Sequence, residues 1–156
     1  MRRAVTCTGS FEIPLEPARA IALFTAEGER AWVDGWDPSY PDPEASPDTA
    51  GTVFLTAAHG GDPVKWMVAA TGERERSYAR FDPSGVAALV EVRCTAAGSG
   101  TRVEVTYSQT ALDEGAVDEL ERFAEGYDAY MHAWREAIES AIERGEIALD
   151  DASRHA

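Results

Sequence analysis

Residues suited to metal, redox or nucleophilic chemistry are scarce in this chain of 156 residues, which has two cysteines and three histidines. Cys7 and Cys94 are far apart and show no metal-binding or redox spacing. Both fall on apolar strand faces, so we expect them to be buried free thiols. The histidines do not cluster, and no nucleophile elbow, zinc-protease helix or phosphate-binding glycine loop is present. The sequence therefore predicts no metal and no other cofactor.

Basic residues are also few, with 14 lysines and arginines against 28 acids and a net charge of −14. Such an acidic surface repels phosphate backbones and anionic lipid headgroups, which argues against binding to nucleic acid or to membranes. Residues 113–147 alone hold 11 acids and 3 bases. We interpret this run as the solvated face of a helix. An acidic docking surface for a basic protein is the alternative.

Long hydrophobic runs are missing as well. No stretch approaches the roughly 18 apolar residues of a membrane span, and the first residues lack the apolar core of a secretory signal. We expect no membrane insertion and a cytoplasmic location. The length predicts one domain over residues 1–147, followed by a short tail at 148–156. A chain of this size can bury a core without a metal or disulfide.

The first third of the chain predicts a strand, two short helical segments and a long loop. Polar and apolar residues alternate over 4–13, as in a half-buried strand. Pro17 suits the first turn of a short helix, and a helical turn is expected over 27–33. Four prolines exclude regular structure from the loop that follows. We expect its aromatic residues to anchor it and its 37–51 stretch to act as a gate.

The remainder predicts an antiparallel meander followed by one long helix. Strands are expected over 52–57, 64–71, 73–82, 86–95 and 102–110. In the second of these, Trp66, Val68 and Ala70 are expected on one face. Apolar residues at three- and four-residue steps then predict one long helix from about residue 113 to Gly145. The fold class is therefore α+β, with a curved antiparallel sheet wrapped around a long C-terminal helix.

The register of residues 73–82 is open between two alternatives. If the Asp82-Pro-Ser-Gly turn makes a three-residue bulged loop, Asp82 opposes Val86, and Tyr78 points inward together with Arg76 and Arg80. If the loop has four residues, Phe81 opposes Val86 and points inward instead, because a slip of one residue moves every side chain to the other face. Turn chemistry favours the first register.

The element order and several stretches resemble the helix-grip fold of the START-like, or SRPBCC, superfamily, which includes Bet v 1-like and polyketide cyclase/dehydrase-like proteins. The resemblance covers about residues 4–145 and is closest to a bacterial branch. Members bind lipids, hormones, polyketides and aromatic compounds, and some catalyse cyclisation or dehydration. The matching stretches lie at 23–25, 28–33, 35–38, 51–54, 65–66, 100–103, 106–107 and 110–112.

The resemblance implies a cavity between the sheet and the C-terminal helix, closed in part by the short helices and the loop. The chain has many tryptophans and tyrosines, which carry a polar group on an aromatic ring, for a single core. These side chains either fill the core or line a ligand cavity. Arg76 is added as an anchor for an acidic or carbonyl group if the first register holds. The candidate ligand-binding residues are Trp32, Trp36, Trp66, Arg76, Tyr78, Tyr107, Tyr127, Tyr130, Met131 and Trp134.

We therefore expect the chain to bind a small hydrophobic or aromatic molecule, lipid- or polyketide-like. One alternative is a cofactor-free polyketide cyclase or dehydratase, with His59 or a tyrosine such as Tyr127 as the acid–base group. The other is a protein-interaction module that uses the acidic helix face. A homodimer is also allowed by the sequence.

Overall fold

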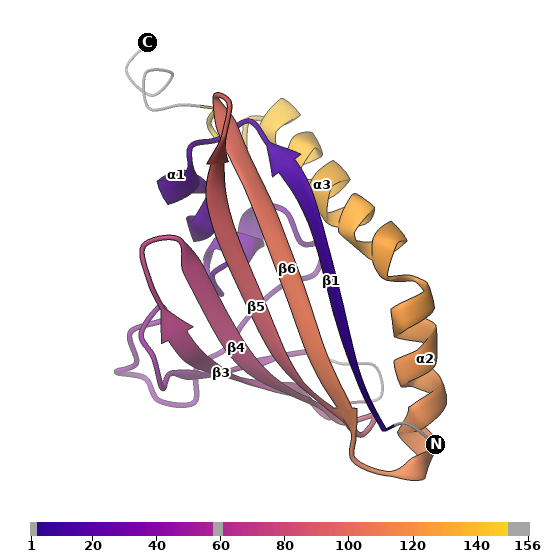
Figure 1. Ribbon diagram of the computed structural model, residues 1–156. Coiled ribbons are helices and arrows are strands. Elements are labelled where there is room, and N and C mark those ends of the chain that lie inside the picture. The colour runs from indigo at the N-terminus through magenta and orange to yellow at the C-terminus, as the bar shows by residue number, and fades with distance from the viewer. Residues whose placement is uncertain (1–2, 58–60, 150–156) are drawn as a thin grey trace.

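The computed structural model describes residues 3–57 and 61–149. Their strands form a six-stranded antiparallel sheet in the order β1-β6-β5-β4-β3-β2. The sheet is twisted and curved (Figure 1), and with the helices it confirms the predicted α+β class. The strands are β1 (Ala4–Ile13), β2 (Val53–Thr56), β3 (Val64–Thr71), β4 (Glu75–Asp82), β5 (Val86–Ala97) and β6 (Gly100–Ala111).

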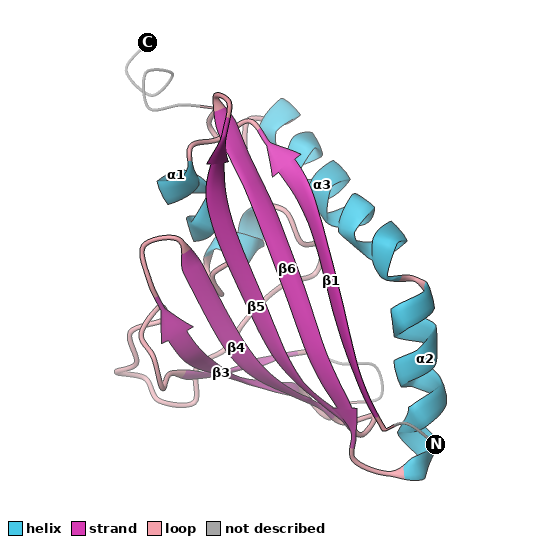
Figure 2. Cartoon of the chain, viewed as in Figure 1, coloured by secondary structure: helices cyan, strands magenta, loops and turns pink. Residues whose placement is uncertain are grey.

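Helices lie in two groups. The α-helix α1 (Pro17–Ala22) and the 3-10 helix η1 (Gly28–Ala31) follow β1. After β6 come the 3-10 helix η2 (Glu114–Ala116) and the α-helices α2 (Val117–Glu125) and α3 (Tyr127–Glu143). In Figure 2, α1 lies behind the sheet while α2 and α3 run along its β1 edge. The apolar side chains of β5 and β6 face this helical side, so the core lies there.

The strand register follows the first alternative. Asp82 pairs with Val86 and Tyr78 with Val90, which places Tyr78 inside and leaves Phe81 49% exposed. Gly85 has φ of 99°, the left-handed conformation that closes a bulged three-residue turn. Arg93 opposes Glu104 across β5 and β6, so opposite charges face each other between these strands. The register is therefore the one that the turn residues predicted, although it leaves Phe81 exposed.

The predicted long C-terminal helix is confirmed, but it is interrupted at Gly126. Gly126 has φ of −93° and ψ of 7°, and separates α2 from α3. Figure 1 shows the change of direction at this point. A glycine weakens a helix at its position, because it loses more conformational freedom on folding than alanine does. The bend lets α2 contact both β1 and β6 while α3 continues along β1. Gly145, with φ of 79°, ends the helix as expected.

Ala70 does not share the face of Trp66 and Val68. A register shift between Val68 and Ala70 inserts a β-bulge into β3, so Ala70 pairs with Ser77 and is exposed. A bulge adds one residue to one strand only and therefore inverts the alternation beyond it.

Close packing of α3 on β1 depends on Gly9. A Cβ at this position would lie 2.9 Å from Met131 Cγ and 3.2 Å from a Tyr127 ring carbon. A Cβ on Gly126, by contrast, would meet Arg122 O at 3.5 Å, an ordinary contact. Of the two cysteines, both free, Cys94 is buried as predicted while Cys7 is only half-buried. Burial raises the pKa of the Cys94 thiol to about 11, which keeps it protonated.

Candidate functional site

An open cavity of about 340 Å³ lies between η1, the inner face of the sheet and the helices α2 and α3. This volume falls in the range of small-molecule sites, roughly 300–1,000 Å³. The ring-bearing residues of its wall are Trp36, Trp66, Tyr107, Phe123, Tyr130 and Trp134. A second hollow of about 410 Å³ is lined by polar and aliphatic side chains of β3 to β6 and no aromatic ones. The aromatic cavity is therefore the candidate site.

Trp66 forms one wall and is fixed on both sides. Its ring stacks on Phe54 with centroids 5.5 Å apart and planes 8° apart, and its Nε1–H donates to Thr56 Oγ1 at 3.0 Å. The Arg80 guanidinium lies 5.2 Å from the ring centroid, a cation–π contact. This preorganised wall presents an aromatic surface to an incoming molecule.

The opposite wall comes from α2, α3 and β6. Tyr107, Phe123, Tyr130 and Trp134 meet in tilted and edge-to-face pairs with centroids 5.1 to 6.4 Å apart. Burial raises the pKa of Tyr107 well above its usual range, so its hydroxyl stays protonated. Tyr130 is 39% exposed, which places it at the mouth. The wall combines apolar area with hydroxyl groups that can orient a ligand.

Glu29 is the half-buried acid of the site. It lines both the cavity and a small inner chamber of about 20 Å³, which is walled by Trp66, Tyr107, Trp134 and other core side chains. Among the described residues, no hydrogen bond or ion pair to its carboxyl is found. Burial raises the pKa of Glu29 to about 8. At neutral pH this carboxyl is therefore mostly protonated and can donate a hydrogen bond or a proton.

Two further polar features lie along the wall. Arg80 Nη2 is 3.0 Å from Asp82 Oδ2. Burial raises the pKa of Asp82, but hydrogen bonds from Ser84 and the charge of Arg80 outweigh it, so the pKa lies below its usual range. The Gln109 side chain is 6% exposed, and its Oε1 is buried without a hydrogen-bond partner in the described part of the chain. A buried acceptor of this kind is costly unless a ligand or water meets it.

The structure brings together about half of the predicted site residues. Trp36, Trp66, Tyr107, Tyr130 and Trp134 line the cavity. Tyr78 lines the inner chamber instead, and its hydroxyl donates to Phe24 O at 2.8 Å.

The other four predicted residues lie elsewhere. Trp32 is buried in the core, with its Nε1–H donating to Leu23 O at 2.8 Å. Tyr127 and Met131 pack beside Gly9, and the Tyr127 hydroxyl donates to Val105 O at 2.6 Å. These three side chains fill the core and do not line the cavity.

Arg76 anchors the proline-rich loop. Its Nε and Nη2 donate to the two carboxylate oxygens of Asp48, both at 2.9 Å, and its Nη1 donates to two backbone carbonyls of β4 and the preceding turn. The Arg76 side chain is 12% exposed and does not line the cavity. A bidentate pair of this geometry uses most of the guanidinium's donors. The role of ligand anchor therefore has no geometric support, although its inward direction was correct.

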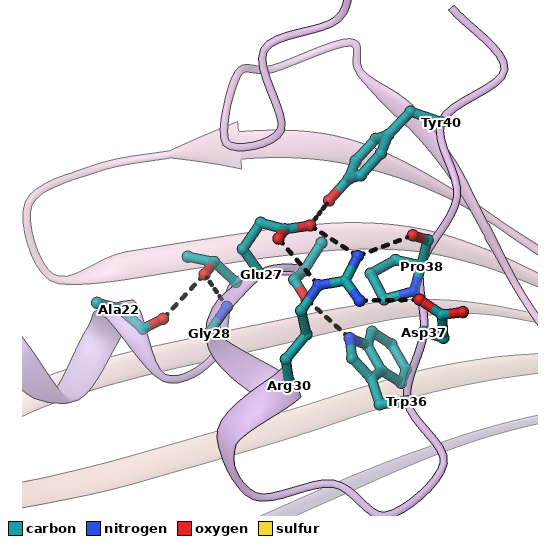
Figure 3. A network of polar contacts seen from close by, with 10 residues as sticks. Ala22, Glu27, Gly28, Arg30, Trp36, Asp37, Pro38 and Tyr40 are labelled. Carbon is teal, nitrogen blue, oxygen red and sulfur yellow. Dashed lines mark hydrogen bonds and ion pairs between the residues drawn. The ribbon is translucent and has the colours of Figure 1, made fainter. Parts of the chain in front are cut away.

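The start of the same loop is held by a second network, drawn in Figure 3. Arg30 donates to Glu27, to Asp37 Oδ1 at 2.9 Å and to Pro38 O at 3.0 Å. The Tyr40 hydroxyl donates to Glu27, and Arg30 with Tyr40 holds the pKa of Glu27 below its usual range. Anchoring by aromatic residues is thus observed. Gating by residues 37–51 stays a prediction.

Replacing Asp48 by asparagine is expected to free the end of this loop. The loss of the charged pair should make cleavage within 37–51 by a non-specific protease several-fold faster, while global stability changes by less than about 1 kcal/mol. The measurement is the rate of loop cleavage followed by mass spectrometry. Glu44→Gln, in the same loop and exposed, is the control. Equal cleavage rates in the two variants would mean that Arg76 does not hold the loop.

Sequence reasoning missed Glu29, Asp34, Glu119 and Phe123 altogether. Gln109 had a signal that could have been used, because it follows Tyr107 on the inward parity of β6. Arg80 was expected to point inward but not to line a site. For Glu29 no local signal exists, since a glutamate in a short turn looks like any solvated acid. His59, the acid–base candidate, lies outside the described residues.

Two negative findings concern the described residues only. No group of three or more histidine, cysteine, aspartate or glutamate side chains among them could hold a metal ion. None of the described helices is long and apolar enough to cross a membrane.

The fold has close counterparts among solved structures. A protein from Rhizobium leguminosarum superposes with a TM-score of 0.65 at 16% identity over 90% of this chain and 95% of that one. Ara h 8.0201 gives 0.64 at 15% identity over 88% and 99%. DynU16, a protein of the dynemicin biosynthetic locus, gives 0.60 at 16% identity over 89% and 48%. No protein-family profile and no curated sequence matches the chain.

These likenesses define the fold as an α+β helix-grip fold, and the open cavity described above lies between its sheet and its helices. The likeness shows the Bet v 1-like helix-grip fold, the fold that the sequence resemblance implied.

Proposed function

We propose that the chain binds a small hydrophobic or aromatic molecule in the cavity between the sheet and the C-terminal helices. The observation that carries this proposal is a cavity of about 340 Å³ walled by six aromatic side chains. Burial of apolar ligand surface would supply the affinity, about 25 cal/mol per Å² before ordering costs. The Tyr130 hydroxyl, Gln109 Oε1 and the Glu29 carboxyl would orient the ligand.

The first test is native mass spectrometry of freshly purified protein, followed by solvent extraction. A stoichiometric small molecule would support the proposal and give the ligand's chemical class. The same protein should bind a neutral hydrophobic dye such as N-phenylnaphthylamine with a rise in fluorescence. If no small molecule co-purifies and the dye does not bind, the proposal is wrong.

Ala57→Phe is expected to weaken dye binding about tenfold by filling the mouth of the cavity. Ala57 lines the cavity and is exposed, so the larger side chain needs no repacking of the core. The matched control is Ala133→Phe, the same change at an exposed position of α3 outside the cavity. Both variants are titrated by calorimetry. Equal affinities would place the dye elsewhere.

A cyclase or dehydratase is the second candidate, and Glu29 is the observation in its favour. A protonated acid among aromatic walls suits proton transfer to a bound substrate. The Tyr127 hydroxyl is already used by Val105 O, so it does not suit that role. The test is whether wild-type protein, but not Glu29→Gln, removes water from an extracted ligand. A homodimer, a basic partner for the acidic helix face and a cytoplasmic location stay predictions.

A further inference from the structure

The ionisable groups of the cavity are unevenly charged. Four carboxyl groups line it, those of Glu29, Asp34, Asp82 and Glu119, against one cation, Arg80. Asp82 already forms an ion pair with Arg80 at 3.0 Å, so the positive charge of Arg80 is neutralised. An anionic ligand would meet this excess of acids and the acidic protein around it, whereas a cation would be attracted.

Glu29 lies at the inner end of this site. Its carboxyl has no hydrogen-bond or ion-pair partner among the described residues, and the rings of Trp66, Tyr107 and Trp134 surround the chamber that it lines. The faces of such rings attract cations, most strongly when the cation is shielded from water. An acid without a partner beside aromatic faces is the arrangement that holds an organic ammonium group.

The geometry points to a compact aromatic molecule with a basic nitrogen as the ligand, its ammonium group lying between the Glu29 carboxyl and the rings of Trp134 and Tyr107. This inference rests on the proposed function, because it names the ligand class of the same cavity. Tyr130 and Phe123 at the outer end would pack on the aromatic part.

Binding of such a cation is coupled to the ionisation of Glu29. In the free protein the pKa of Glu29 is about 8, so below that pH the carboxyl must release its proton to solvent when the ammonium group enters. No covalent bond changes, and the amine keeps its own proton. The other ionisable groups that face the two chambers are Asp34, Tyr78, Arg80, Asp82, Tyr107, Glu119 and Tyr130.

The test uses three probes with one ring system: naphthylethylamine, naphthylethanol and naphthylacetate. We expect the amine to bind at least about tenfold more tightly than the alcohol near pH 8, and the acetate to bind weakest. Affinity for the amine should rise about tenfold or more from about pH 6 to pH 8. Calorimetry near pH 7 in buffers of different ionisation enthalpy should show release of nearly one proton per amine bound.

Two variants separate the role of Glu29 from general acidity. Glu29→Gln should lose both the pH dependence and the proton release. Glu119→Gln, the same change at the half-exposed rim of the cavity, should keep them. Circular dichroism of both variants establishes that they are folded.

Other results would overturn the inference in distinguishable ways. If the alcohol binds as tightly as the amine and its affinity falls as the pH rises through about 8, Glu29 donates a hydrogen bond as a neutral acid; the proposed function then stands and the amine is wrong. An amine preference that Glu29→Gln leaves unchanged would also refute it. If none of the three probes binds, the inference fails, and the proposed function fails with it if nothing co-purifies and the neutral dye does not bind either.

Discussion

Glu29→Gln is expected to stabilise the folded chain by about 2 kcal/mol at neutral pH. The pKa of this carboxyl rises from a reference value of 4.5 to about 8 on burial, so the folded state resists its ionisation. A full conversion of that shift would give a larger figure, which we reduce because the cavity admits water. Glutamine has nearly the same shape and cannot ionise. Thermal unfolding should show a melting temperature higher by about 4–8 °C.

The stabilisation expected from Glu29→Gln depends on pH. Between about pH 4.5 and pH 8 the folded state binds more protons at Glu29 than the unfolded state does, so this residue makes stability fall as the pH rises. Below that window Glu29 is protonated in both states, and Glu29→Gln should then match the wild type. Glu119→Gln should change stability little at any pH. A variant with the same pH profile as the wild type would mean that Glu29 is not buried from water.

A destabilising acid in a cavity is typical of a site kept for function. Nothing in the fold itself requires a carboxyl among these rings. The stability gained by Glu29→Gln should therefore accompany the loss of pH-dependent binding described above.

Gly28→Ala is expected to destabilise the chain by about 3 kcal/mol. A Cβ on Gly28 would lie 1.8 Å from Ala22 O and 2.9 Å from Thr25 Oγ1, so η1 must move away from α1. The move would also break the hydrogen bonds in which Gly28 N–H donates to Thr25 Oγ1 and the Thr25 hydroxyl donates to Ala22 O, both 2.9 Å long (Figure 3). Urea unfolding measures the loss.

The matched control is Gly126→Ala. Gly126 has a negative φ, and a Cβ there would lie 3.5 Å from Arg122 O, an ordinary contact. Alanine should be neutral there or stabilise by about 0.5–1 kcal/mol. If both variants unfold at the same urea concentration, the contact between η1 and α1 is not as rigid as the geometry requires.

The sequence pattern predicted correctly those features whose geometry is set by residues close together in the chain. Alternation placed the strands within a few residues of their bounds, because side chains on a strand point to opposite faces in turn. The Asp82-Pro-Ser-Gly turn predicted the register that puts Tyr78 inside. The same alternation failed at Ala70, since a bulge is an insertion that the pattern does not reveal.

The cavity was predicted in kind but only partly in its members. Aromatic composition together with the family resemblance led to Trp66, Tyr107 and Trp134. The same composition also selected Trp32 and Tyr127, which are core residues here. An inward aromatic side chain looks identical in both roles until its neighbours are known.

The sequence by itself determined the α+β class, the antiparallel meander, the inward register of β4 and the acidic C-terminal helices, because each follows from periodicity or turn chemistry over a few residues. Only the tertiary structure decided that Glu29 faces Trp66 and Trp134, and that Arg76 binds Asp48. Those partners come from segments 28 to more than 100 residues apart in the chain. Their juxtaposition depends on how the sheet curves and where the helix bends, which no local pattern specifies.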